Sequence, residues 1–324
     1  MKALVSISLA VAVVIALILH IGMGAPVSYT PEGDFAVSLN EDGETLTITG
    51  YLGADVEIRI PSRISNLPVT IIGDDAFSGR LRDPDDPESG HQLTSVTIPY
   101  GIIHIGRDAF AHNLLRELYL PDSVRTVGDA AFAHNQLANV RLSERLTELP
   151  VAVFNWNSLE QIHIPSGVTR IRNWAFRNND LTHIDIPENV TRIDCWAFAN
   201  NNLTELTIPR NVTNIGNGTF AHNRLRRLEF EAPSSLRRMA NFAFANNALV
   251  EMRLPESLVQ MDYRTFENNS LTYVSIPAGF RRMGRAIFAG NEGLGDLNID
   301  IPEAEARSRL GRYWRDTAMG IDWR

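Results

Sequence analysis

The chain has 324 residues, of which 44% are hydrophobic and 21% are charged, so it can bury a sizeable core and does not have a disordered composition. Its formal net charge of −8 makes nucleic-acid binding a poor prediction, because phosphates require a basic face. Cys195 is the only cysteine and Lys2 the only lysine, which excludes intrachain disulfides and, in a form without the leader, Schiff-base or phosphate-loop chemistry.

Residues 1–24 have the character of a targeting segment. Lys2 is followed by an apolar run from Ala3 to Leu19 and by the small residues Gly22 and Gly24, a pattern typical of a signal peptide cleaved after Gly24. The run is also long enough to span a bilayer as an uncleaved N-terminal anchor, which is the only membrane contact that the sequence suggests. Both interpretations predict an exported protein, located outside the cell, at its surface or in the periplasm.

Residues 25–57 are predicted to form an N-terminal hairpin cap. Two alternating runs lie between Asp34 and Tyr51, and the turn-forming letters "NEDGE" separate them. This pattern predicts a β-hairpin that covers the first coil of the segment that follows.

From residue 58 to residue 301 one phrase recurs every 22 residues. Its phenylalanines keep this spacing except for an 11-residue insertion before Phe110 and a two-residue insertion at Pro233–Ser235. Asparagine stands three residues after each phenylalanine from Phe110 onward. A segment of the form Leu-x-x-φ-x-φ, where φ is apolar, begins two residues later in most repeats. The alternation predicts a short strand with one buried face, which a following proline ends in most repeats.

A single unit of this size cannot bury its own apolar side, whereas stacked units form a continuous core. We therefore predict a strand-rich repeat solenoid of the α/β type with about ten 22-residue coils and parallel stacked short strands. At about 4.8 Å per strand, ten coils give a rod or gentle arc of about 45–50 Å. Phenylalanine and leucine should form apolar ladders, and the asparagines should form a ladder of amide hydrogen bonds between coils.

The phrase "LT-x-φ-x-IP-x-x-VT-x-IG-x-x-AF-x-x-N" resembles the BspA-like leucine-rich repeats of bacterial surface antigens, most closely those of treponemes. The resemblance covers residues 58–301, and "GETLTITGYLGADVEIRIPSRISNLPVTIIGDDAF" is similar to that family's N-terminal coil. The resemblance implies a leucine-rich repeat fold and adhesion to host or neighbouring-cell proteins. Residues 302–324 leave the pattern and are predicted to form a C-terminal cap with some helix.

Residues 22 apart become surface neighbours in such a fold, so that candidate sites run down columns of equivalent positions. Two columns of outward strand positions are predicted to form one exposed sheet face of mixed charge. This sheet face is interpreted either as a recognition surface for a protein or glycan ligand or as an ordinary solvated sheet. The candidate contact residues are Tyr119, Arg141, His163, His183, Asp185 and Tyr273.

Other features suggest sites only weakly. His112 and His134 are one coil apart, but their column contains no carboxylate or third ligand, so no metal site is predicted. Trp174 and Trp196 are equivalent and should stack, as a sugar platform or as coil packing. Three arginine pairs in the C-terminal third form a basic strip that suits acidic glycans or anionic surfaces, or is a solvated face: Arg226/Arg227, Arg237/Arg238 and Arg281/Arg282.

The sequence thus predicts an exported, non-enzymatic protein without a cofactor that presents its sheet face to another macromolecule. One alternative is a structural or assembly component of the cell envelope. The other is a hydrolase that would use His163, His183 and Asp185 on adjacent coils, although the sequence offers neither a nucleophile nor a deep pocket there.

Overall fold

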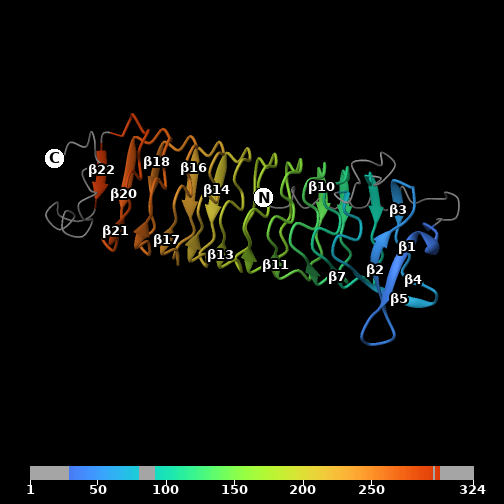
Figure 1. The fold of residues 1–324 in the computed structure, drawn as a ribbon. Helices are drawn as coiled ribbons and strands as arrows, with labels where there is room; N and C mark the ends of the chain where they lie inside the picture. The colour runs from blue at the N-terminus through green and yellow to red at the C-terminus, as the bar shows by residue number, and fades with distance from the viewer. Residues whose placement is uncertain (1–28, 80–91, 295, 300–324) are drawn as a thin grey trace, which may run out of the picture.

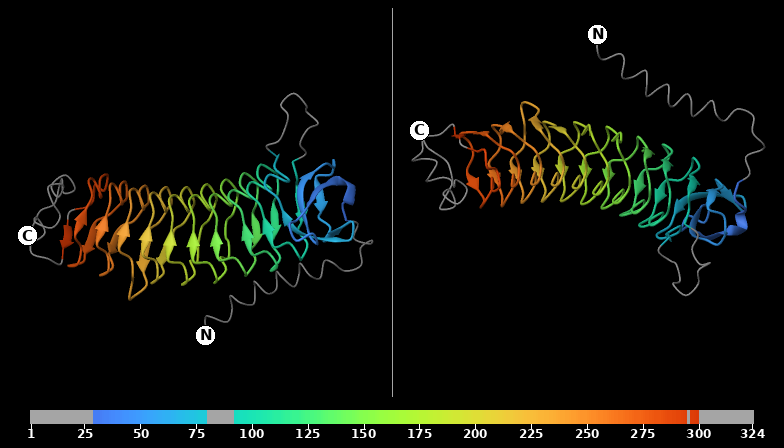
Figure 2. Two further views of the ribbon diagram at one scale, coloured as in Figure 1. Left: turned by 60° about the horizontal axis from the view of Figure 1, so that its bottom comes forward. Right: turned by 90° about the horizontal axis from the view of Figure 1, so that it is seen from above.

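The computed structural model describes residues 29–79, 92–294 and 296–299. These residues form an elongated rod of stacked coils, with the N-terminal hairpin at one end and β22 at the other (Figures 1 and 2). The predicted leader at residues 1–24 and the predicted C-terminal cap at residues 302–324 lie outside the described residues. In the part of the chain that the structure describes, no helix is long and apolar enough to cross a membrane.

The N-terminal end is closed by an antiparallel hairpin, as the sequence predicts for Asp34 to Tyr51. A single 3-10 turn, η1 (Glu32–Asp34), leads into β1 (Phe35–Leu39), which pairs with β2 (Leu46–Tyr51). β2 then pairs in parallel with β5 (Leu67–Ile72), which also pairs with the short strand β4 (Arg63–Ile64). The sheet continues through the first coils as β7 (His104–Ile105) and β9 (Thr126–Val127).

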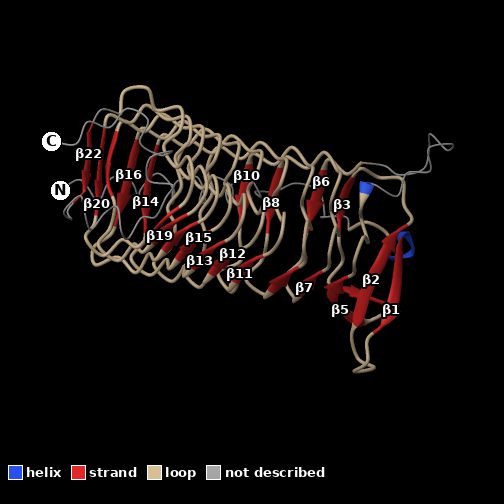
Figure 3. Ribbon diagram, turned by 60° about the vertical axis from the view of Figure 1, so that its left-hand side comes forward, coloured by secondary structure: helices blue, strands red, loops and turns tan. Residues whose placement is uncertain are grey.

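Each coil has two opposite sides, which Figure 3 shows as two rows of strands. One side, the short-strand face, continues beyond β9 as a seven-stranded parallel sheet of two-residue strands. Its members are β11 (Glu148–Leu149), β12 (Arg170–Ile171), β13 (Arg192–Ile193), β15 (Asn214–Ile215), β17 (Arg238–Met239), β19 (Gln260–Met261) and β21 (Arg282–Met283).

The other side, the long-strand face, contains the strands predicted from the alternating segments. They are β3 (Glu57–Arg59), β6 (Ser95–Thr97), β8 (Glu117–Tyr119), β10 (Asn139–Arg141), β14 (Glu205–Ile208), β16 (Arg227–Phe230), β18 (Glu251–Arg253), β20 (Tyr273–Ile276) and β22 (Asp296–Ile299).

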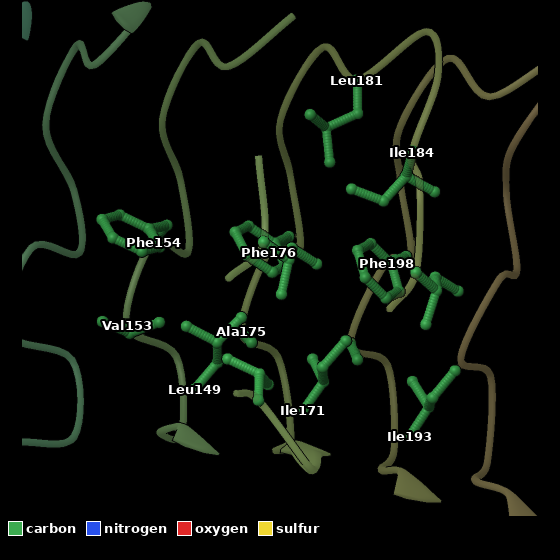
Figure 4. Packing of buried hydrophobic residues seen from close by; sticks show 14 of the residues in the cluster. Leu149, Val153, Phe154, Ile171, Ala175, Phe176, Leu181, Ile184, Ile193 and Phe198 are labelled. Carbon is green, nitrogen blue, oxygen red and sulfur yellow. The ribbon is translucent and has the colours of Figure 1, made fainter. Parts of the chain in front are cut away.

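The register confirms that residues 22 apart are neighbours. Arg170 is the partner of Arg192, and the two-residue insertion shifts this to Asn214 beside Arg238. Phe154, Phe176 and Phe198 stand in one row through the core (Figure 4). Their ring centroids are 5.7 and 5.3 Å apart and their planes lie within 14° of parallel. The strand-rich solenoid predicted from the repeat is therefore confirmed.

The prediction of one continuous sheet on the long-strand face is wrong. Its strands pair only in four separate groups, β3 with β6, β8 with β10, β14 with β16, and β18 with β20 and β22. The coils around His163 and His183 form no strand, although Ile164 and Ile184 remain buried. The alternating pattern fixes which side chains enter the core, whereas strand pairing also requires neighbouring backbones to approach to about 4.8 Å. On the short-strand face the pairing between coils is interrupted only once, between β9 and β11, among the strands that the structure describes.

Candidate functional site

Tyr119 and Arg141 form the best-defined contact between predicted site residues on the long-strand face. The parallel register of β8 and β10 makes them neighbours, and the guanidinium carbon of Arg141 lies 4.7 Å from the centroid of the Tyr119 ring. Tyr119 is 53% exposed. Nη2 of Arg141 also lies 3.1 Å from Oδ2 of Asp122, so the cation is positioned over the aromatic face by a carboxylate.

Asp122 is positioned in turn by its own hydrogen bonds. The backbone N–H of Glu144 donates to Oδ1 of Asp122 at 3.1 Å, and Arg141 donates to Oδ2. The backbone hydrogen bond, supported by the bond and the charge of Arg141, holds the pKa of Asp122 below its ordinary value, although burial acts in the opposite direction. The carboxylate therefore stays ionised at neutral pH and keeps Arg141 in place.

The three residues predicted as an acid–base group are not brought together. Nε2 of His183 lies 3.0 Å from Oδ1 of Asp185, but Nε2 of His163 faces Glu144 at 3.9 Å. The side chains of His163 and Asp185 are 80% and 94% exposed. The sequence predicts a cluster of these three side chains because they lie on adjacent coils. The structure shows that outward side chains on unpaired coils are free to turn toward different partners.

The hollow beside His183 is too small and open to enclose a substrate. Its volume is about 160 Å³, and its lining includes Asp185, Thr207 and Glu231. Within the described part of the chain, no hydrogen bond joins His183 to the Thr207 hydroxyl. The arrangement therefore contains an imidazole–carboxylate pair but no nucleophile activated by it.

Tyr273 lies apart from the other predicted residues, in a groove that the sequence did not predict. The groove measures about 1080 Å³ and opens where β16 and β18 do not pair. Phe230, Met252 and Leu254 line it together with charged side chains of both signs. The signal for it in the sequence is the two-residue insertion at Pro233–Ser235, which lengthens the turn at this break.

The stacked histidines form a ring column and not a ligand set. The centroids of His112 and His134 are 4.3 Å apart with planes at 11°, and Trp156 continues the stack at 6.2 Å from His134. Among the residues that the structure describes, no group of three or more histidine, cysteine or acidic side chains is placed to hold a metal ion. The column is thus a packing feature of the turns.

The predicted stacking of Trp174 on Trp196 is not among the ring contacts of the described residues. Arg177 lies over the Trp196 ring, with its guanidinium carbon 5.7 Å from the ring centroid. The ring also lies against Gly218, where an added Cβ would clash with the indole. Because Gly218 has no side chain, the indole of Trp196 has room to lie over the following coil, so equivalent positions do not ensure stacking.

The predicted basic strip is divided between the two faces. Arg227 belongs to β16 on the long-strand face, where Glu229 neutralises it at 2.6 Å. Arg238 and Arg282 belong to β17 and β21 on the short-strand face. Arg238 and Arg282 therefore lie along the short-strand face, on the side of the rod where Figure 1 labels β17 and β21, and Arg227 does not.

The model of the BspA type leucine-rich repeat region, in six copies, matches residues 88–204 and 169–295. No curated protein matches the chain significantly.

Several solved structures are similar to this chain. One is a leucine-rich cell surface protein of Faecalibacterium prausnitzii, 21% identical, which covers 89% of this chain and 98% of its own, with a TM-score of 0.42. The pneumococcal vaccine antigen PcpA is 19% identical, covering 84% of this chain and 81% of its own, with a TM-score of 0.50. A leucine-rich repeat protein of T. pallidum is 19% identical, covering 91% of this chain and 98% of its own, with a TM-score of 0.29.

Proposed function

Because the chain belongs to the BspA type leucine-rich repeat family, we propose that it is an exported, non-enzymatic protein that binds another protein at the cell surface through its long-strand face. The apolar segment from Ala3 to Leu19 supports export. The repeats supply a rigid scaffold, and the side chains that differ from coil to coil supply the recognition.

The contrast between inward and outward positions on the long-strand face supports this proposal. Inward positions such as Leu118 and Ile184 are apolar and buried, as stacking of the coils requires. The outward positions next to them are Tyr119 and Asp185, and equivalent coils place arginine, histidine, glutamate or threonine there. Folding constrains the inward residues, whereas the outward residues can vary to match a partner.

The observation that carries the proposal is the exposed Tyr119–Arg141 pair. Tyrosine and arginine are enriched among the residues that dominate binding energy in protein interfaces. Here the two are already in contact, and Asp122 restrains the arginine before a partner arrives. Such preorganisation lowers the conformational entropy lost on binding. We infer that the pair serves as an anchor for the partner, and that the groove beside Tyr273 provides a second contact further along the face.

Surface plasmon resonance of the full chain against immobilised extracellular-matrix and envelope proteins tests the proposal. We expect the double variant Tyr119→Ala/Arg141→Ala to bind any recognised protein at least about thirtyfold more weakly, since each of two such anchor residues contributes more than about 1 kcal/mol. A matched double variant on the short-strand face, Thr191→Ala/Asn214→Ala, should bind like the parent protein.

The results separate the proposal from its alternatives. Equal binding by both double variants would place the contact elsewhere. A rod that binds none of these proteins but self-associates would favour the structural role at the envelope. Hydrolysis of a bound substrate that is lost in His183→Ala would favour the enzyme.

A further inference from the structure

The short-strand face carries a regular row of arginines. Arg192, Arg238 and Arg282 occupy equivalent positions on β13, β17 and β21, and Asn214 and Gln260 stand on the strands between them. Neighbouring strands are about 4.8 Å apart, so these three arginines recur at about 10 Å along the rod, and Arg170 on β12 adds a fourth directly beside Arg192. A row with this spacing can follow a linear molecule laid along the solenoid.

The residues just before β17 and β21 add further positive charge at the C-terminal end of the short-strand face. Arg237 precedes β17 and Arg281 precedes β21, and both are exposed. Among residues 237–239, 259–262 and 281–283, which form this part of the face, the only acidic group is Asp262, whose Oδ2 accepts a hydrogen bond from Nε of Arg238 at 2.9 Å. The chain as a whole carries a net charge of −8, so this face reverses the sign of the molecule locally.

Three of these arginines have no acidic partner among the described residues, so their charge is available to a ligand. Arg192 is neutralised by Asp194 at 2.6 Å and Arg238 by Asp262. In contrast, Arg237, Arg281 and Arg282 form no ion pair with any residue that the structure describes. Like charges on nearby coils repel one another, and a bound anion would remove that repulsion.

The surroundings of the row favour a glycan over other polyanions. The short strands β13, β15, β17, β19 and β21 contain no aromatic residue on which the bases of a single-stranded nucleic acid could stack. Their apolar residues, such as Ile193, Met239 and Met283, are buried and cannot insert into a lipid headgroup layer. Asn214 is exposed and offers an amide to hydroxyl groups between the arginines.

We propose that Arg237, Arg281 and Arg282 form the centre of a binding site for a linear acidic polysaccharide that lies along the short-strand face. The planar guanidinium groups suit carboxylate and sulfate groups, to which they can donate two hydrogen bonds. This site is on the opposite side of the coils from the proposed protein-binding face, so that the rod can hold a glycan and a protein at the same time.

Binding of the full chain to heparin and to polygalacturonate tests the proposal, because the first polymer carries sulfate and the second only carboxylate. The variant Arg237→Gln/Arg281→Gln/Arg282→Gln should bind about tenfold more weakly, since three exposed charge pairs are lost. The control Arg116→Gln/Arg226→Gln/Arg253→Gln removes the same charge from other exposed positions and should bind like the parent protein. Binding should also weaken with rising salt concentration.

Binding of heparin alone identifies sulfate as the ligand group, and binding of both polymers identifies any regularly spaced anion; both support the site. Failure of both polymers to bind, or equal weakening in the two triple variants, overturns it. Tighter binding of single-stranded DNA or anionic vesicles through the same three arginines overturns the glycan assignment. Thermal melting of each variant checks that it is folded. If the triple variant is unfolded, heparin binding is measured on the single variant Arg282→Gln instead.

Discussion

The backbone N–H of Leu159 donates a hydrogen bond to Oδ1 of Asn179, one coil further along the rod, at 3.0 Å. Nδ2 of Asn179 donates in turn to the carbonyl oxygens of Phe154 and Phe176, at 2.8 and 3.2 Å. One buried amide thus satisfies three backbone groups in neighbouring coils. The same arrangement recurs at the equivalent asparagines, for example at Asn135 and Asn201.

Replacing Asn179 by leucine should lower the free energy of unfolding by about 3 kcal/mol. The substitution keeps the volume but leaves a buried N–H and two carbonyl groups without that partner, and each such group costs about 1–3 kcal/mol. Urea unfolding followed by circular dichroism measures the change. Asn202→Ala is the control, because its amide bonds only the exposed Asp180 at 3.3 Å, and it should leave the midpoint unchanged. Equal midpoints for the two variants would contradict a structural role for the ladder.

The phenylalanine row predicts a dependence on position in the rod. Phe176 is fully buried and stacks on rings in both neighbouring coils, whereas Phe288 is stacked on Phe266 alone among the described residues, at 6.0 Å. Phe176→Ala should lower the free energy of unfolding by about 4 kcal/mol, as for a well-packed core phenylalanine. Phe288→Ala should lower it by less, because a solenoid loses only one coil interface at its end. Denaturant titration of both variants checks the order, and a larger effect at Phe288 would contradict it.

The sequence predicted the interior of the rod well because each interior contact repeats. Phe198 and Asn201 are constrained in the same way in every coil, so one period of 22 residues contains the whole pattern. The hairpin between Asp34 and Tyr51 was equally visible from its turn. Nothing in that pattern fixes how closely the backbones approach on the long-strand face, and this is why its division into four groups was not foreseen.

The candidate site was less predictable because an outward side chain can pair either within its own coil or with a neighbouring coil. Tyr119 and Arg141 do meet across coils, as their register requires. His183 instead pairs with Asp185 of its own coil, two residues away, whereas His163 lies near Glu144 of the preceding coil. Column position alone does not distinguish these outcomes, because the choice depends on rotamers and charges that the period leaves free.

The pKa of Asp122 predicts a pH dependence for the Tyr119 site. A carboxyl group whose pKa is lower in the folded protein adds stability above its unfolded pKa of about 3.9, and this stability is lost as the pH falls through the folded value. Asp122→Asn should therefore lower the melting temperature at pH 6, and its difference from the parent protein should shrink as the pH falls below about 4. Asp185→Asn, at a side chain that is 94% exposed, serves as the control. If the difference in melting temperature between Asp122→Asn and the parent protein stays constant down to acidic pH, the charge of Asp122 does not contribute to stability.

Asp194 predicts a gain of binding on the short-strand face. Its buried carboxylate lies 2.7 Å from Nη2 of Arg170 and 2.6 Å from Nε of Arg192, so one acid neutralises two members of the basic surface. Asp194→Asn keeps the shape of the side chain but removes its charge, which leaves both arginines available to an anionic glycan. We expect heparin to bind this variant about fivefold more tightly, since each exposed pair gained contributes about 0.5 kcal/mol. Asp185→Asn makes the same change in net charge on the opposite face and should leave heparin affinity unaltered. Equal tightening in both variants would mean that heparin responds to total charge, whereas a gain confined to Asp194→Asn would extend the site from β21 toward β12.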